Sequence, residues 1–184
     1  DSSMSTIRVV YTADQIRKRL QEMVAEISAD YEGKELVLVG ILKGSAFFLA
    51  DIARMFEPSV SLDFEFVDVT TSGGDRGAVV SLTYATQINV EGRHVLILKD
   101  VFHSGITENY LITHLSQQKP ASAEIAALVD KPQLRSVNLT ARYAAFTNTP
   151  EGFLIGYGLG PSRSEHTNLP DLCVLNSGED PASV

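Results

Sequence analysis

The feature that most constrains this chain is an alternation of short, continuous apolar runs with amphipathic stretches. Residues 36–42, "LVLVGIL", have the pattern of a β-strand covered on both faces, because a strand inside a parallel sheet has no solvent-facing side. Residues 45–56, "SAFFLADIARMF", follow with the periodicity of a helix. Strand and helix in this alternation predict an α/β fold, a mostly parallel twisted sheet flanked by helices.

Further elements continue the pattern. Strand-like runs are expected at residues 61–69, 78–85, 94–98, 124–129, 153–158 and 172–175, with a helix at about 106–118. Near the start of the chain, Thr12 and Gln15 fit a capping box, which predicts the beginning of another helix. The buried face of that helix is expected to consist of Ile16, Leu20, Met23, Val24 and Ile27, and Gly33 ends the segment.

Length and composition narrow the class of protein. The 184 residues fit a single domain, with residues 1–10 and 178–184 expected to be frayed. A formal net charge of −8 argues against general nucleic-acid binding, which requires a basic surface. No apolar run approaches the roughly 20 residues of a membrane span. Cys173, the only cysteine, is expected to be buried, and the lack of a disulfide favours a cytoplasmic protein.

Two loops are expected to meet at the carboxyl edge of the sheet, where folds of this kind bind ligands. One contains Lys43 and Gly44, and the other is residues 103–107, "HSGIT". Free backbone N–H groups at the start of a helix favour an anion, to which Ser104 and Thr107 add hydroxyl groups. The local pattern alone leaves an ordinary strand-to-helix connection open. Residues 70–77, "TTSGGDRG", are interpreted as a mobile hairpin lid or an exposed turn.

Several motifs together resemble one family. Residues 95–107, "VLILKDVFHSGIT", are similar to the phosphoribosyl-pyrophosphate (PRPP) motif of type I phosphoribosyltransferases. Residues 39–54, "VGILKGSAFFLADIAR", resemble the pyrophosphate loop of the hypoxanthine-guanine branch. Residues 129–132, "VDKP", and 153–159, "FLIGYGL", resemble its purine-recognition lysine and aromatic clamp. The resemblance implies the type I phosphoribosyltransferase fold, in which a small hood and a hairpin lid accompany the main sheet.

The resemblance also implies roles for the residues that would bind PRPP. Lys43 and Gly44 would bind pyrophosphate, next to a non-proline cis peptide bond. The 5′-phosphate would be held by Ser104, Gly105, Ile106 and Thr107. Asp100 would accept a hydrogen bond from a ribose hydroxyl, and it is a possible metal ligand. An exposed lysine at a helix start, or an aspartate that merely ends a strand, are the alternatives.

At the purine end, the resemblance assigns base recognition to Lys131, Phe153 and Leu154. Lys131 would donate to the 6-oxo group and so favour hypoxanthine, guanine or xanthine over adenine. Phe153 would stack on the purine, while the backbone of Leu154 would contact the edge of the ring. A surface lysine and a phenylalanine in the core remain open as alternatives.

The sequence departs from the family pattern at the expected centre of the chemistry. Lys99-Asp100 stands where the family has two acidic residues, His103 where it has an aspartate, and Gly160 where a magnesium-contacting aspartate is usual. The usual arginine after this segment is absent, although Arg163 lies nearby, and the Ser-Tyr pair of the lid is missing. An acidic residue exchanged for Lys99 counts as two charge units, and the aspartates exchanged for neutral His103 and for Gly160 count as one each, so the pocket is about four units more positive and has lost carboxylates that hold Mg²⁺. Magnesium is therefore expected to arrive with PRPP.

The altered residues bear on catalysis in opposite ways. His103 suits a general base, since the ordinary pKa of histidine is about 6.5, but a solvent-facing loop histidine is equally consistent. Lys99, expected among the ribose and phosphate ligands, should raise the barrier to a positively charged transition state unless phosphate neutralises it or it points away.

The leading functional hypothesis is a purine-salvage phosphoribosyltransferase that makes IMP, GMP or XMP and pyrophosphate from PRPP and a 6-oxopurine. One alternative is a weak or inactive relative that binds a nucleotide or PRPP as a sensor or regulator. Another is a transferase acting on a non-standard base. The resemblance also implies a homodimer or homotetramer.

Overall fold

The computed structural model describes residues 6–74, 77–84, 87–161 and 165–176. Its elements follow in the order β1 (Thr6–Tyr11), α1 (Ala13–Asp30), β2 (Glu35–Leu42), α2 (Ala46–Ala53), β3 (Ser61–Gly74), β4 (Gly77–Tyr84), β5 (His94–Phe102), α3 (Ile106–Ser116), β6 (Ser122–Asp130), a 3-10 turn (Pro132–Leu134), β7 (Tyr143–Phe146), β8 (Phe153–Ile155) and β9 (Leu172–Asn176). The helices and strands alternate largely as the sequence predicts, although α2 and α3 end a few residues earlier than expected.

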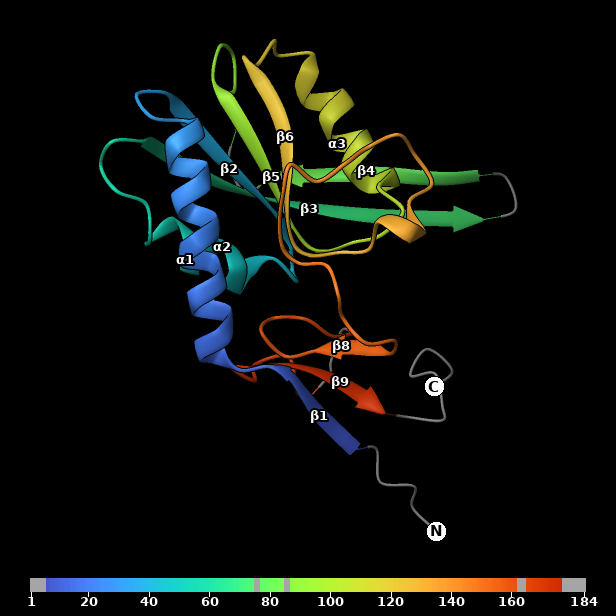
Figure 1. Ribbon diagram of the computed structural model, residues 1–184. Helices are drawn as coiled ribbons and strands as arrows, with labels where there is room; N and C mark the ends of the chain where they lie inside the picture. The colour runs from blue at the N-terminus through green and yellow to red at the C-terminus, as the bar shows by residue number, and fades with distance from the viewer. Residues whose placement is uncertain (1–5, 75–76, 85–86, 162–164, 177–184) are drawn as a thin grey trace.

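The central sheet has the strand order β4-β3-β2-β5-β6-β7 (Figure 1). Strand β2 pairs in parallel with β3 on one side and β5 on the other, and β6 and β7 continue the parallel part. Only the pairing of β4 with β3 is antiparallel among the described strands of this sheet. The predicted mostly parallel α/β fold is confirmed.

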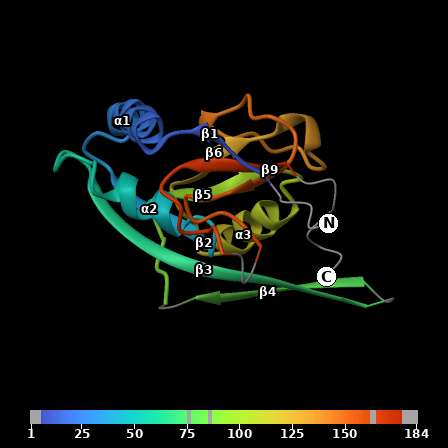
Figure 2. The same cartoon turned by 90° about the horizontal axis from the view of Figure 1, so that it is seen from below.

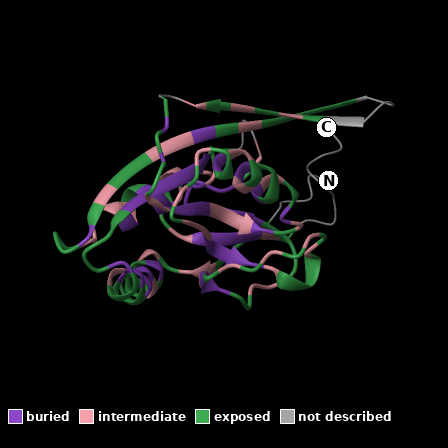
Figure 3. Ribbon diagram, turned by 90° about the horizontal axis from the view of Figure 1, so that it is seen from above, coloured by how far each residue is buried: buried purple, intermediate pink, exposed green. Residues whose placement is uncertain are grey.

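Side chains of β2 alternate between the two faces of the sheet, which explains why this strand is apolar from Leu36 to Leu42. Leu36 and Leu38 belong to a core cluster that includes the buried faces of α1 and α2. Val37 and Val39 belong to a second cluster on the other face, with Leu111 of α3. Figure 3 shows the buried strands between the helices. Burial on both faces fixes the register, because a slip by one residue would exchange the two sets.

Helix α1 begins as the capping box predicts. The Thr12 hydroxyl accepts from the Gln15 N–H at 3.2 Å, and the Thr12 N–H donates to Gln15 Oε1 at 2.8 Å. All of the expected apolar residues of this helix are buried: Ile16, Leu20, Met23, Val24 and Ile27. Within the described residues, no helix has the length and apolar character needed to cross a bilayer.

A small antiparallel sheet of order β1-β9-β8 lies beside the central sheet (Figure 1). We call this sheet, with the described residues between β8 and β9 (156–161 and 165–171), the hood. Strand β1 corrects the prediction that residues 1–10 are frayed, because residues 6–9 pair with β9 from Thr6↔Asn176 to Val9↔Cys173, and a register shift precedes Tyr11. Their partner lies more than 160 residues away in the sequence, so local pattern gave no sign of it. Residues 178–184 lie outside the described part of the chain.

Strands β3 and β4 form the predicted hairpin, which extends as a long ribbon along one side of the molecule (Figure 2). The pairing runs from Val67↔Tyr84 to Gly74↔Gly77, so β3 continues well beyond the expected residues 61–69. Residues 75 and 76 of the predicted lid lie outside the described residues. The mobility of this hairpin stays a prediction.

Candidate active site

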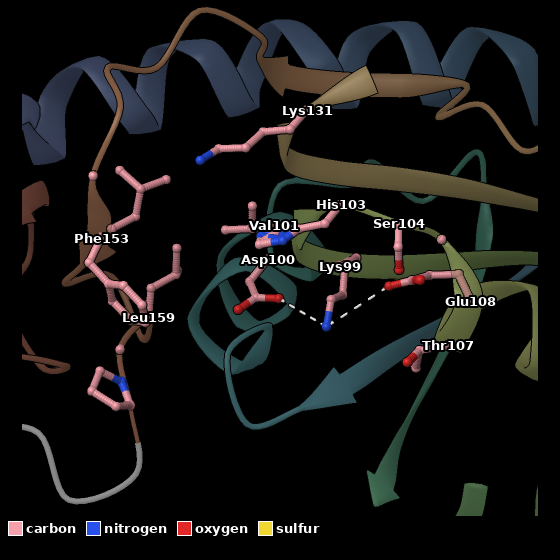
Figure 4. A pocket seen from close by; sticks show the side chains of 15 residues that line it. Lys99, Asp100, Val101, His103, Ser104, Thr107, Glu108, Lys131, Phe153 and Leu159 are labelled. Atoms are coloured by element: carbon pink, nitrogen blue, oxygen red, sulfur yellow. Dashed lines mark ion pairs between the residues drawn. The ribbon is translucent and has the colours of Figure 1, made fainter. Parts of the chain in front are cut away.

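A pocket of about 400 Å³ lies where the carboxyl ends of β5 and β6 face the hood. Figure 4 shows an ordered arrangement of its side chains. Phe153 and Leu159 lie at one end, and Ser104, Thr107 and Glu108 lie at the other. Lys99, Asp100 and His103 occupy the middle, and Lys131 reaches in from the end of β6.

The loop between β5 and α3 has the geometry of an anion-binding helix start. Gly105 adopts φ 80° at the N-cap, and a Cβ there would approach Val137 Cγ2 at 2.9 Å, so the position requires glycine. Ser104 and Thr107 line the pocket. Ile106 is 55% exposed, and its contribution to the loop is its backbone N–H. This N–H donates to Ser104 Oγ at 3.4 Å. The first-turn amides have no partners within the helix, and the Ile106 N–H reaches Ser104 Oγ only at this long distance, so the helix start is suited to an anion.

Arg135 holds this loop in place, a role that no sequence motif indicates. Its guanidinium donates to the carbonyl oxygens of Phe102 at 3.1 Å and His103 at 2.7 Å, and to Asp130 Oδ1 at 2.6 Å. The same group stacks on the Phe102 ring at 3.4 Å from its centroid. Because the Ser136 N–H also donates to the Ser104 carbonyl at 2.9 Å, the segment after β6 fixes the shape of the phosphate loop.

The loop after β2 approaches the same carboxylate from the other side. A Cβ on Gly44 would sit 2.6 Å from Asp100 Cγ and closer still to Oδ2, so only glycine allows this contact. The peptide bond between Leu42 and Lys43 is cis, as the resemblance implies. Lys43 is exposed and is not among the residues that line the pocket. The structure thus brings Gly44 and Asp100 together and leaves the Lys43 side chain at the rim.

Lys99 lies between two carboxylates. Its Nζ is 3.5 Å from Asp100 Oδ1 and 3.9 Å from Glu108 Oε1 (Figure 4). Glu108 is only 3% exposed and lines the pocket, although the sequence analysis did not single it out. Burial raises the pKa of the Glu108 carboxyl, and the nearby Lys99 opposes that rise. The pocket is therefore less positive than the sequence predicts, because the prediction did not include the Glu108 carboxylate.

His103 lines the middle of the pocket and remains exposed as a residue. Partial burial of its ring, together with the ammonium groups of Lys131 and Lys99, lowers the pKa of His103 below its ordinary value. Asp100 opposes this shift but does not reverse it. The imidazole is consequently neutral at neutral pH and available to accept a proton.

The other end of the pocket is suited to a flat, polar ring. Phe153 is 45% exposed and lines the pocket, which contradicts the alternative that it is plain core. Leu154 is buried beside it, and the Lys131 backbone N–H donates to the Phe102 carbonyl at 3.0 Å. An aromatic face and an ammonium group thus border the same space.

The hood is fixed to the central sheet through α2. The Tyr157 hydroxyl donates to the Asp51 carboxylate, and its ring meets Phe47 edge-on at 6.0 Å. Gly160 lines the pocket with φ 140°, a conformation that an aspartate would adopt only with strain. Arg163 lies outside the described residues.

No group of three His, Cys, Asp or Glu side chains in the described parts of the chain is placed to hold a metal ion. Asp100, the possible metal ligand, and Glu108 both have Lys99 as a neighbour. The residues present do not fit a metal held by the protein alone.

Comparison with known proteins identifies the family. The phosphoribosyl transferase domain family matches residues 10–160. The chain is 34% identical to a hypoxanthine-guanine phosphoribosyltransferase of Streptococcus pneumoniae, over 91% of this chain and 92% of the relative. It is 35% identical to the enzyme of the same name from Staphylococcus aureus, over 91% and 92% of the two chains.

A solved structure supports the same assignment. It is a variant of the Trypanosoma cruzi hypoxanthine phosphoribosyltransferase in complex with the product IMP, with 33% identity and a TM-score of 0.83 over 95% of this chain and 92% of that one. The chain therefore belongs to the phosphoribosyltransferase family of pentosyltransferases, in its hypoxanthine-guanine branch.

Proposed function

We propose that this protein transfers the 5-phosphoribosyl group of PRPP to a 6-oxopurine, such as hypoxanthine, guanine or xanthine, and releases pyrophosphate. The observation that carries the proposal is the order of groups along one pocket. Anion-binding hydroxyls and amides lie at one end, a carboxylate lies in the middle, and a lysine beside an aromatic ring lies at the other (Figure 4). That order matches phosphate, ribose and purine in a nucleotide.

The phosphate end would be bound without a protein-held metal. Ser104 and Thr107 supply hydroxyl donors beside the free amides of the first turn of α3. Gly44, with its backbone against Asp100, would admit pyrophosphate close to the ribose, and Lys43 at the rim would contribute a cation. We propose that Mg²⁺ arrives with PRPP, since its pyrophosphate and ribose oxygens chelate the ion and Lys99 occupies the carboxylates of the site.

The base end explains a preference for oxopurines. The Lys131 ammonium donates hydrogen bonds and cannot accept them, so it pairs with a carbonyl oxygen and not with an amino group. Phe153 would stack on the ring and Leu154 would contact its edge through the backbone. Rejection of adenine follows because its amino group would leave a donor facing a donor.

In the reaction, the bond from ribose C1 to pyrophosphate breaks while a purine nitrogen attacks C1 through an oxocarbenium-like state. His103 would take the purine proton, since its neutral imidazole lies in the middle of the pocket. Asp100 would hold a ribose hydroxyl and offset positive charge that develops at C1. The concern that Lys99 opposes this charge is reduced, because the lysine has Asp100 and Glu108 as counterions.

A second candidate is binding of a nucleotide or PRPP without turnover, in a sensor or regulatory role. The observation that favours it is the position of Lys99, which engages Asp100, the carboxylate that the reaction requires. The cytoplasmic location and the homo-oligomer stay predictions under either candidate.

Turnover decides between the two candidates. The protein is mixed with PRPP, Mg²⁺ and one of hypoxanthine, guanine, xanthine or adenine, and the release of pyrophosphate is followed. Release with a 6-oxopurine and not with adenine is the expected result. No release with any base, together with calorimetric binding of GMP, refutes the transferase and supports the second candidate.

A further inference from the structure

The Lys99–Glu108 pair is a feature of this pocket that the proposed roles leave unused. Carboxylates are rarely as buried as Glu108, at 3% exposure, unless they are paired. Its ion-pair partner is the Nζ of Lys99, at 3.9 Å from Glu108 Oε1. The Lys99 side chain is 25% exposed and lines the pocket. The pair links the middle of the pocket, on β5, to the first turn of α3 (Figure 4).

The position of Glu108 makes it a competitor of a bound phosphate. It is the third residue of α3, where the positive end of the helix stabilises a negative side chain. The proposed phosphate site uses the same amides, and Glu108 lines the pocket with Ser104 and Thr107. A phosphate that enters therefore meets a carboxylate whose ion-pair partner is Lys99.

The Lys99 ammonium has both Asp100 and Glu108 as neighbours, and a bound phosphate would be a third partner. In the protein without ligand its ammonium has Asp100 at 3.5 Å and Glu108 at 3.9 Å. Neither distance is that of a short charge-assisted hydrogen bond, which is about 2.7–2.9 Å. The ammonium therefore retains capacity to bind a phosphate or ribose oxygen, and each carboxylate reduces its availability.

We propose that Glu108 is a positioning residue that restrains Lys99 beside Asp100 and thereby limits how strongly Lys99 binds a phosphoribosyl ligand. The inference rests on the proposed function in that the ligand carries a ribose phosphate. The family has a carboxylate where this chain has Lys99. In this pocket, Glu108 of α3 supplies a negative charge next to that lysine.

Calorimetric titration with GMP tests the proposal in four proteins: the wild type, Glu108→Gln, Lys99→Met and the double variant. Glu108→Gln keeps the shape of the side chain and releases Lys99, so the GMP Kd is expected to fall about 5- to 20-fold. Without Lys99, the buried carboxyl loses its ion-pair partner, its pKa rises further, and it is expected to bind a proton. In the Lys99→Met background, Glu108→Gln then replaces a neutral carboxyl group by a neutral amide. The GMP Kd of the double variant is therefore expected to differ less than twofold from that of Lys99→Met.

Two further variants guard against indirect effects. Asp14→Asn removes an exposed first-turn carboxylate of α1, paired with Arg17 at 2.8 Å, and is expected to leave the GMP Kd unchanged. Glu108→Asp keeps the charge on a shorter side chain and is expected to tighten binding by less than Glu108→Gln. Thermal melting of each variant confirms that it folds.

A GMP Kd that rises or stays constant in Glu108→Gln overturns the proposal. So does an equal gain with and without Lys99, because Glu108 would then act on the phosphate directly. A wild-type protein that binds GMP but releases no pyrophosphate contradicts only the proposed reaction. One that binds no GMP at millimolar concentration contradicts both the reaction and this inference.

Discussion

Replacing Gly44 by alanine should damage catalysis while leaving the fold intact. The new Cβ would lie 2.6 Å from Asp100 Cγ and closer still to Oδ2, whereas real Cβ contacts below 3.0 Å essentially never occur, so the Asp100 carboxylate must move out of its place. The shift would break the proposed bond from a ribose hydroxyl to Asp100. Hydrogen bonds to charged groups contribute about 1.5–3 kcal/mol, which predicts a loss of about 10- to 150-fold in kcat/KM.

The assay is steady-state pyrophosphate release from PRPP and hypoxanthine, with thermal melting on the same protein. Gly33→Ala is the matched control, since φ is 73° there and nothing lies within 4 Å of a new Cβ. It should cost about 1–2 kcal/mol of stability through backbone strain and leave kcat/KM unchanged. Equal loss of activity in both variants, or full activity in Gly44→Ala, would refute the reasoning.

Three other substitutions test the proposed roles. His103→Asn should remove the acid limb of the pH–rate profile; in the wild type this limb should lie below pH 6.5, because a lowered pKa keeps the imidazole neutral to lower pH. A profile with an unchanged limb would exclude His103 as the base. Lys131→Met should reduce kcat/KM for hypoxanthine about 100-fold and narrow the discrimination against adenine, as measured by competition between the bases. Arg135→Met should lower the unfolding free energy by about 3–5 kcal/mol, because it leaves Asp130 without its partner; denaturant titration would show a much smaller loss if the clamp is unimportant.

The strands and helices that the sequence predicts are those with a local signature. Strand β2 is apolar from Leu36 to Leu42 because both of its faces are covered, and α1 carries a capping box and a single apolar face. Strand β1 has no buried residue, since its positions are exposed or intermediate, and it is ordered by pairing with β9. Strand β7 is only four residues long, "YAAF", and is too short to carry a clear periodic signal.

The residues of the candidate site that could be predicted are likewise those with a local sequence signature. Ser104, Gly105 and Thr107 were found because a helix start after a buried strand is a recognisable phosphate site. Glu108 was missed because an acidic residue in the first turn is ordinarily a solvated one, and its burial depends on Lys99 from a neighbouring strand. Arg135 was missed because its partners, such as the His103 carbonyl, lie about 30 residues earlier in the sequence.

The most direct test of the central claim is a crystal structure of the protein with IMP bound. The account predicts the phosphate within about 3 Å of the Ser104 and Thr107 hydroxyls and of the backbone N–H groups at the start of α3, with the base on Phe153 and its oxygen facing Lys131. IMP bound elsewhere on the protein, with no phosphate at this helix start, would contradict the account.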